Sequence, residues 1–242
     1  MTEPVTVGEL LALLAHDLKN PLAAVLTNLA YARGFVDALP PEAQAEDVRE
    51  ALLDARLASE SVQRFVSNLE LLAIDFSGST NLRRDSLPPL GLGSLVDEAV
   101  TRQKPHAEAR RIKIDVQSEA SVDGARIDQD NLVRAIENLV ANAVQHAPSG
   151  SAVLVSIARD GSDVVVDVLD DGSQVPPELE AAAQTAEGQV RLKADPHARY
   201  GRGVGLFAAA IAARLSGGRI ELGSRGGRSQ LRLRIPRHDG EW

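Results

Sequence analysis

The sequence predicts an α+β protein of two domains: an antiparallel helical hairpin, then an α/β sandwich in which helices cover one face of a mixed, mostly antiparallel sheet. Two long helical patterns with few breakers fill residues 1–75. Strands and helices alternate with glycine-rich turns over residues 93–236, and a segment rich in Ser, Gly and Pro, residues 76–92, lies between them. We therefore expect a hairpin domain, a linker that includes an edge strand, a sandwich domain and a short tail over residues 237–242.

The composition excludes several classes of protein. Of the 242 residues, 44% are hydrophobic and 25% charged, which is ordinary for a globular chain. The formal net charge of −8 and the aromatic fraction of 3% argue against a nucleic-acid-binding protein. The absence of cysteine excludes disulfides, thiolate metal sites and thiol nucleophiles. The apolar run Leu10–Ala15 is too short to span a bilayer and follows no basic cluster, so we expect a cytoplasmic protein without a membrane span.

The first domain is predicted to be two helices, over residues 7–39 and 42–74, separated by Pro40 and Pro41. Each helix carries apolar residues at the spacing of a bundle seam. The two stripes are Leu11, Leu14, Leu18, Leu22 and Val25, then Val48, Leu52, Ala55, Val62, Val66, Leu69 and Ala73. Because two helices alone enclose no core, we expect the hairpin to dimerise into a four-helix bundle.

The second domain is predicted from alternating apolar residues in its strands and from capping and turn residues at its helix ends. Pro148 ends one helix, Asp160 and Gly161 form a hairpin turn, and Gly217 and Gly218 close another helix. The expected elements are an edge strand near residues 83–87, a helix over 94–110, a strand over 112–116, a helix from its N-cap Asp128 to His146, a hairpin of 153–157 with 164–168, a helix over 203–215, and a hairpin of 220–222 with 231–235.

One candidate for chemistry is the segment around His16. On a helix, His16 points away from the apolar stripe, Asn20 lies one turn later on the same face, and Asp17 is adjacent. Pro21 removes one backbone hydrogen bond and bends the helix there. An exposed imidazole beside a carboxylate suits a nucleophile, because the carboxylate fixes the tautomer and accepts a proton. The alternative is a solvated histidine on a polar helix face.

Two further candidates lie on a helix and at a strand end. Asn138 and Asn142 share one helical face, where their oxygens suit a divalent ion and the phosphates that it bridges. Asp170 and Gly172 follow a predicted strand, where a carboxylate suits the exocyclic amine of adenine and a glycine lets the base approach. The alternatives are an ordinary polar helix face and an ordinary turn.

A fourth candidate is a glycine-rich segment that opens a helix, and the amides at such a position hold phosphate. The alternative is a flexible loop that is capped into a helix. Its residues are Gly201, Arg202, Gly203, Val204, Gly205 and Leu206.

In this order and at these separations, the four segments resemble the kinase core of two-component sensor histidine kinases. HDLKNPL resembles the H-box, DQDNLVRAIENLVANAVQHA the N-box, LDDG the start of the G1 box, and GRGVGL the G2 box. The resemblance covers roughly residues 7–236. It implies a dimerisation and phosphotransfer hairpin, followed by an ATP-binding catalytic domain of the family shared with DNA gyrase.

The resemblance also implies roles for single residues. His16 would be phosphorylated from ATP, with Asp17 as base or orienting group, and would pass the phosphoryl group to an aspartate on the receiver domain of a response regulator. Asp17 and Asn20 also match the pattern of a phosphatase. Mg²⁺ would be held by Asn142, and the chain would be a homodimer. The nucleotide-binding residues would be Asn138, Asn142, Gln145, His146, Asp170, Gly172, Gly201, Arg202, Gly203, Val204, Gly205, Leu206 and Ser229.

The chain departs from the family pattern at several positions. Gln174 stands in place of a second G1 glycine, Arg228 in place of a glycine of the last glycine box, and Gln145 where a lysine facing the phosphates is common. The segment 178–198 carries no phenylalanine. We also expect that no sensor domain precedes the hairpin, so that any input comes from a partner or from the expression level. These departures leave a second hypothesis open: a phosphotransfer or docking protein that binds no ATP and has a degenerate catalytic domain.

The long polar segment over residues 173–202 joins the G1-like turn to the phosphate-binding glycines, so it must cover any nucleotide that binds there. Residues 179–186 are predicted to form a short helix, and the sequence shows nothing that would anchor it. We expect a lid that is mobile without nucleotide and orders over the phosphates. Lys193, Arg199 or Arg202 would supply positive charge, unless they are solvated residues of a surface loop.

Overall fold

The computed structural model describes residues 18, 21–32, 34, 44–77, 89–118, 123–126, 129–174, 180–189 and 204–236. The chain divides into two compact units, Met1–Glu70 and Leu71–Trp242. This division falls a few residues before the boundary at residue 75 that the sequence predicts. None of the described helices combines the length and the apolar character that a membrane span requires.

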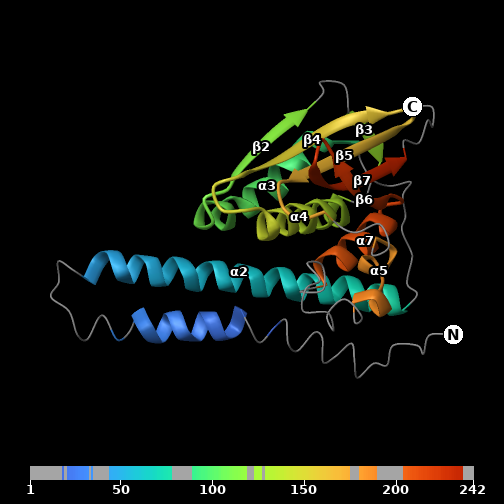
Figure 1. Cartoon of the computed structure of the whole chain (residues 1–242). Coiled ribbons are helices and arrows are strands. Elements are labelled where there is room, and N and C mark those ends of the chain that lie inside the picture. Colours follow the sequence, from blue (N-terminus) through green and yellow to red (C-terminus); the bar gives the residue numbers. More distant parts are fainter. Residues whose placement is uncertain are drawn as a thin grey trace. The chain divides into compact units, whose positions relative to one another are not determined.

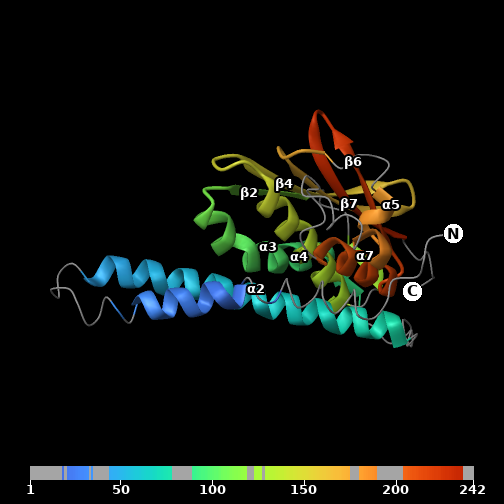
Figure 2. The same cartoon turned by 60° about the horizontal axis from the view of Figure 1, so that its bottom comes forward.

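The first unit contains a pair of helices. Residues 21–32 are helical and lie beside the first half of α2 (Gln44–Ser77) in both views (Figure 1, Figure 2). Ala32, Ala51 and Ala55 are buried, and these small residues allow helices to approach closely. The arrangement is the helical hairpin that the sequence predicts, although its expected start over residues 7–17 and the Pro40–Pro41 turn lie outside the described residues.

The apolar stripe predicted for α2 is only partly buried within one chain. Ala55 is buried, but Leu52 and Val66 are 51% and 45% exposed, and Ala73 is exposed as well. The buried side of α2 instead includes Ala51 and Phe65. The helix therefore has two apolar sides, of which a single chain covers one.

The second unit consists of a five-stranded sheet, a separate two-stranded ribbon and helices. Its elements are β1 (Pro89–Gly91), α3 (Leu92–Ala109), β2 (Lys113–Ser118), β3 (Asp123–Arg126), α4 (Gln129–His146), β4 (Ala152–Asp160), β5 (Asp163–Asp170), α5 (Glu180–Ala183), α7 (Gly205–Leu215), β6 (Arg219–Arg225) and β7 (Arg228–Pro236). The strand order is β2-β4-β5-β7-β6, and only the β2–β4 pair is parallel. Helices α3, α4 and α7 lie on one side of this sheet (Figure 1, Figure 2). The predicted mixed, mostly antiparallel sheet with helices on one face is confirmed.

The two predicted hairpins form with the expected pairing. The strands β4 and β5 meet at a two-residue turn of Gly161 and Ser162, one residue later than predicted, because Asp160 still pairs with Asp163. Gly161 has a φ of 65°, a conformation that favours glycine. In the second hairpin Ile220 lies opposite Leu233, and Leu222 opposite Leu231. Alternate residues of β4 and β7 are buried, and β5 is buried along almost its whole length, so these strands form the sheet's half of the core beneath the helices.

The ribbon of β1 and β3 is a difference from the prediction. The two strands pair antiparallel, and no local pattern in the sequence predicted β3. The edge strand expected near residues 83–87 lies outside the described residues, and so does the expected N-cap Asp128. The helix that follows it, α4, ends at His146 as predicted.

Residues 180–189 are packed rather than unanchored, which corrects the expectation for this part of the lid. They contain α5 and a further helical turn over residues 186–189. Ala183 and Gln189 are both fully buried, and Gln189 Nε2 donates a hydrogen bond of 2.6 Å to the Ala183 carbonyl oxygen. The remainder of the proposed lid, residues 175–179 and 190–203, lies outside the described residues.

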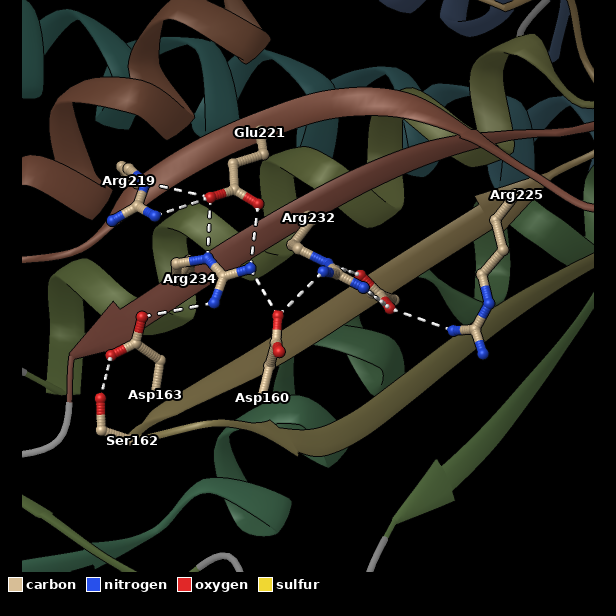
Figure 3. A network of polar contacts seen from close by, with 9 residues as sticks. Asp160, Ser162, Asp163, Arg219, Glu221, Arg225, Arg232 and Arg234 are labelled. Atoms are coloured by element: carbon tan, nitrogen blue, oxygen red, sulfur yellow. Dashed lines mark hydrogen bonds and ion pairs between the residues drawn. The ribbon is translucent and has the colours of Figure 1, made fainter.

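The sheet face opposite the helices carries a network of arginines and acids (Figure 3). Asp167 is only 2% exposed and accepts hydrogen bonds from Arg232 Nε and Nη2 at 2.6 and 2.8 Å. Arg234 donates to Glu221 at 2.7 Å and to Asp160 at 2.6 Å, and these hydrogen bonds raise the pKa of its guanidinium above the ordinary value. Paired charges thus line this face of the sheet.

Candidate functional site

The contact between α4 and α7 brings together two of the four candidate segments. Asn138 of α4 is 3% exposed, and its Nδ2 donates a hydrogen bond of 2.9 Å to the Arg134 carbonyl oxygen. A Cβ atom added to Gly205, the first residue of α7, would lie 3.4 Å from Asn138 Oδ1. The glycine therefore lets the start of α7 approach the asparagine closely, with no side chain between them.

Asn142 lies one helical turn beyond Asn138 and carries a buried polar atom with an unmet hydrogen bond. Its amide nitrogen, Nδ2, has no hydrogen-bond partner within the part of the chain that the structure describes. A buried donor without an acceptor costs free energy of about 1–3 kcal/mol. A ligand that supplies an acceptor oxygen removes this cost, so Asn142 has the character of a binding residue.

The end of β5 forms the second part of the site. Asp170 is fully buried, and its Oδ1 accepts a hydrogen bond of 2.8 Å from the backbone amide of Gly172. Ser229 of β7 lies directly opposite Asp170 and is also fully buried. Residues opposite one another share a face of the sheet, so a carboxylate and a hydroxyl lie next to each other here. Helix α4 contacts both β5 and β7, on the face that the helices cover.

The structure describes only some of the remaining candidate site residues. Val204 and Leu206 are buried at the start of α7, where the Val204 carbonyl oxygen accepts a hydrogen bond of 2.8 Å from the Ala208 amide. Gln145 is exposed and His146 half-buried in the last turn of α4. The candidates outside the described residues are His16, Asp17, Asn20, Lys193, Arg199, Gly201, Arg202 and Gly203.

Residues that the sequence analysis did not select support this site from α3. Both carboxylate oxygens of Glu137 accept hydrogen bonds, from Arg102 at 3.1 Å and from Gln103 at 3.2 Å. They join α3 to α4 immediately before Asn138. The partners are more than thirty positions apart in the sequence, so no local pattern could have indicated them.

Two side-chain contacts join the turn after β5 to the β6–β7 hairpin. Arg228 Nε lies 2.7 Å from Asp171 Oδ1, and Gln174 Nε2 donates a hydrogen bond of 3.1 Å to the Gly227 carbonyl oxygen. Both residues were noted in the sequence only as departures from a family pattern. In the structure they connect the turn after β5 to the turn between β6 and β7.

Comparison with known proteins identifies the second unit. Residues 127–239 match the family described as histidine kinase-, DNA gyrase B-, and HSP90-like ATPase. The chain contains a histidine kinase catalytic core. This kinase core is similar to the alginate biosynthesis sensor protein KinB of Pseudomonas aeruginosa, with 25% identity over 88% of the chain and 34% of KinB. It is also similar to the sensor-like histidine kinase SenX3 of Mycobacterium tuberculosis, with 29% identity over 62% of the chain and 34% of SenX3.

Solved structures show the same fold. The histidine kinase AdeS of Acinetobacter baumannii superposes with a TM-score of 0.57 at 15% identity, covering 93% of the kinase core and 98% of AdeS. Full-length ShkA in complex with AMPPNP gives a TM-score of 0.57 at 22% identity, covering 96% and 46% of the two chains. The catalytic domain of ThkA gives 0.52 at 18% identity over 63% and 96%. The kinase core spans between about a fifth and a third of the length of the curated relatives that it matches.

Proposed function

We propose that the protein is an ATP-dependent protein-histidine kinase that phosphorylates His16 and passes the phosphoryl group to an aspartate of a response regulator. The observation that carries this proposal is the close approach of Gly205 to Asn138, with Asn142 one helical turn further along α4. It supplies a buried amide that needs an acceptor, next to the start of an eleven-residue helix. Amides at a helix start and a buried amide donor are both suited to phosphate oxygens.

The adenine end of the nucleotide would lie at the end of β5. Asp170 would accept a hydrogen bond from the exocyclic amine, Gly172 would let the base approach the backbone, and Ser229 would support the same pocket. Its position opposite Asp170 supports this assignment. The triphosphate would then extend toward the α4–α7 contact.

The phosphate end would be held by the start of α7 and the last turns of α4. We assign phosphate contacts to the glycine-rich segment that contains Gly205. We place Asn138, Gln145 and His146 beside this segment. The segment is Gly201, Arg202, Gly203, Val204, Gly205 and Leu206. Within the described residues no cluster of His, Asp or Glu is placed to hold a metal ion, so the ion would depend on Asn142 and the nucleotide itself. Mg²⁺, when bound, would neutralise charge on the phosphate oxygens.

In the reaction, an imidazole nitrogen of His16 attacks the γ-phosphorus as the bond to the ADP oxygen breaks. Asp17 receives the ring proton or holds the reactive tautomer. The phosphoryl group then moves from the His16 nitrogen to a carboxylate oxygen of the receiver aspartate. Positioning and charge neutralisation supply most of the rate enhancement in such transfers. We also propose that Asn20 orients water in the reverse, phosphatase reaction.

The exposed apolar side of the hairpin supports a homodimer as the working form. Leu22, Leu26 and Leu29 are 46%, 60% and 47% exposed, and their spacing places them on one face of the first helix. Leu52 and Val66 add a second exposed stripe on α2. A second copy of the hairpin would cover both stripes in a four-helix bundle.

Phosphorylation with ATP labelled at the γ-position tests the proposal. The wild-type chain should incorporate label in an acid-labile form, as expected for a phosphorus–nitrogen bond, and the variant His16→Ala should incorporate none. Thr27→Ala, an exposed position of the helix over residues 21–32, is the matched control and should label normally. Stable labelling of the His16→Ala chain would contradict the assignment of His16. A wild-type chain that binds no ATP would favour the phosphotransfer or docking protein instead.

A further inference from the structure

The turn that follows β5 is attached to the rest of the sheet at both of its ends. At one end, Arg228 forms an ion pair with Asp171. At the other end, the side chain of Gln174 donates a hydrogen bond to the Gly227 carbonyl oxygen. Two consecutive residues, Gly227 of the β6–β7 turn and Arg228 at the start of β7, therefore hold the last and first residues of the segment 171–174.

The guanidinium of Arg228 does more than pair with one acid. Its Nη2 donates hydrogen bonds to the carbonyl oxygens of Ala152, the first residue of β4, and of Leu169, near the end of β5. Because Ser229 lies opposite Asp170, Arg228 lies next to Asp171 at the end of the ladder. A planar guanidinium with five donors can join three neighbouring strands in this way, and a glycine has no group that can.

These contacts act on the two residues that we propose receive adenine. Asp170 and Gly172 flank Asp171 directly, and the hydrogen bond from the Gly172 amide to Asp170 Oδ1 closes the turn internally. Fixing Asp171 thus fixes the position of the buried carboxylate. A recognition group that is held in place before its ligand arrives needs no further ordering on binding, which favours both affinity and selectivity.

We propose that Arg228 and Gln174 are positioning residues that hold the turn after β5 for adenine and so set the preference for adenine over guanine nucleotides. This inference rests on the proposed function, since it assumes that Asp170 meets the base. Guanine presents a carbonyl oxygen where adenine presents its amine. A fixed carboxylate accepts from the amine and repels the oxygen, whereas a loosened turn lets the carboxylate move aside.

This proposal gives a function to Gln174 and Arg228, the two residues that depart from the glycines of the family pattern. At both positions the resembled family has glycine, and this chain has a side chain that reaches across to the other turn. The Arg228 side chain is 27% exposed and that of Asp171 45%, so solvent partly screens their attraction. We therefore expect an effect of about three- to tenfold on nucleotide affinity rather than a complete loss.

The test compares the affinities of the full chain for ATP and for GTP, each with excess Mg²⁺, by calorimetry. Arg228→Ala should weaken ATP binding about three- to tenfold and GTP binding less than about twofold, so the preference for ATP falls. Gln174→Ala should act in the same direction with a smaller effect. Arg228→Lys, which keeps the charge opposite Asp171, should restore part of the preference. Arg225→Ala is the matched control from the same hairpin, because Arg225 pairs with Asp167 instead, and it should leave both affinities unchanged.

The outcomes of this test distinguish a failure of the inference from a failure of the proposed function. Equal weakening of ATP and GTP in Arg228→Ala and Gln174→Ala would overturn the inference, because a general loss of structure affects both nucleotides alike. Unchanged affinities in both variants would overturn it too. A wild-type chain that binds neither nucleotide would instead overturn the proposed function, and that result appears before any substitution is made.

Discussion

At the scale of single residues, the buried carboxylate of Asp170 is the clearest sign that function and stability compete at this site. It is fully buried at the end of a strand, where an apolar residue would fill the same space without the cost of burying a charged group. Its neighbours on the same face of β5, Val166 and Val168, are apolar and fully buried. The adenine contact that we propose for Asp170 would explain a carboxylate in such a row.

The variant Asp170→Asn tests this explanation. It keeps the size of the side chain but replaces one acceptor oxygen by an amide donor, so ATP affinity should fall at least about tenfold. The thermal unfolding temperature should stay the same or rise, because a neutral amide costs less to bury than a carboxylate. Calorimetry and thermal unfolding measure the two effects. Asp163→Asn, at the opposite end of β5, is the control for affinity, and a loss of stability without a loss of affinity in Asp170→Asn would contradict the assigned role.

Among the helices and strands, the sequence predicted those whose position depends on residues close together in the chain. Alternating Val153, Val155 and Ile157 indicated β4, and a proline two residues beyond His146 marked the end of α4. The strand β3 was missed because its four residues include a single apolar one, Ala125, and because it forms only by pairing with β1. Which side of α2 is buried was likewise not predictable, since that depends on the helix that packs against it.

The exposed stripe on the first helix leads to a prediction about assembly. Leu26→Glu places a charge in the middle of the surface that we propose the second hairpin covers, so the dimer should dissociate at least about a hundredfold more readily. Sedimentation velocity over a range of concentrations measures the change. The control is Thr27→Glu, an exposed position on the same helix that flanks the leucine stripe. A Leu26→Glu chain that remains as dimeric as wild type would exclude this surface as the interface.

At the scale of the whole molecule, the arginine–acid network ties the stability of the sheet to pH. The hydrogen bond and charge of Arg234 hold the pKa of Asp160 below its ordinary value. Partial burial raises the pKa of Glu221, but the hydrogen bond and charge of Arg234, together with Arg219, outweigh it and the pKa is lowered as well. Carboxylates with lowered pKa values stabilise the folded state above their ordinary pKa values, and this contribution is lost as the pH falls through the lowered ones.

Urea unfolding should therefore show a lower free energy of unfolding at pH 3 than at pH 7. In Arg234→Gln, which removes the main cause of both lowered pKa values, the free energy at pH 7 should fall and its decrease toward pH 3 should become smaller. Lys104→Gln, a surface substitution on α3, is the control and should keep the pH dependence of the wild type. An Arg234→Gln chain with the full wild-type pH dependence would show that other groups cause it.

Some features of the site could be predicted from the sequence, whereas others depend on contacts that form only in the folded chain. The spacing of Asn138 and Asn142 and the strand end at Asp170 were visible because each motif is a few residues long. The contact of Asn138 with Gly205 and the pairing of Asp170 with Ser229 join residues about sixty positions apart, so they follow from strand order and helix packing. The contacts of Arg228 and Gln174 were hidden for the same reason.

We propose that α4, α7 and the end of β5 form an ATP site, and titration of the variant Asn142→Ala with Mg-ATP is the sharpest test of this site. The buried Asn142 amide has no acceptor among the described residues, so a bound nucleotide should supply one and the variant should bind ATP at least about tenfold more weakly. Gln129→Ala, an exposed amide at the start of α4, should bind as the wild type does. Wild-type affinity for ATP in the Asn142→Ala chain, or no binding by the wild-type chain, would contradict the account.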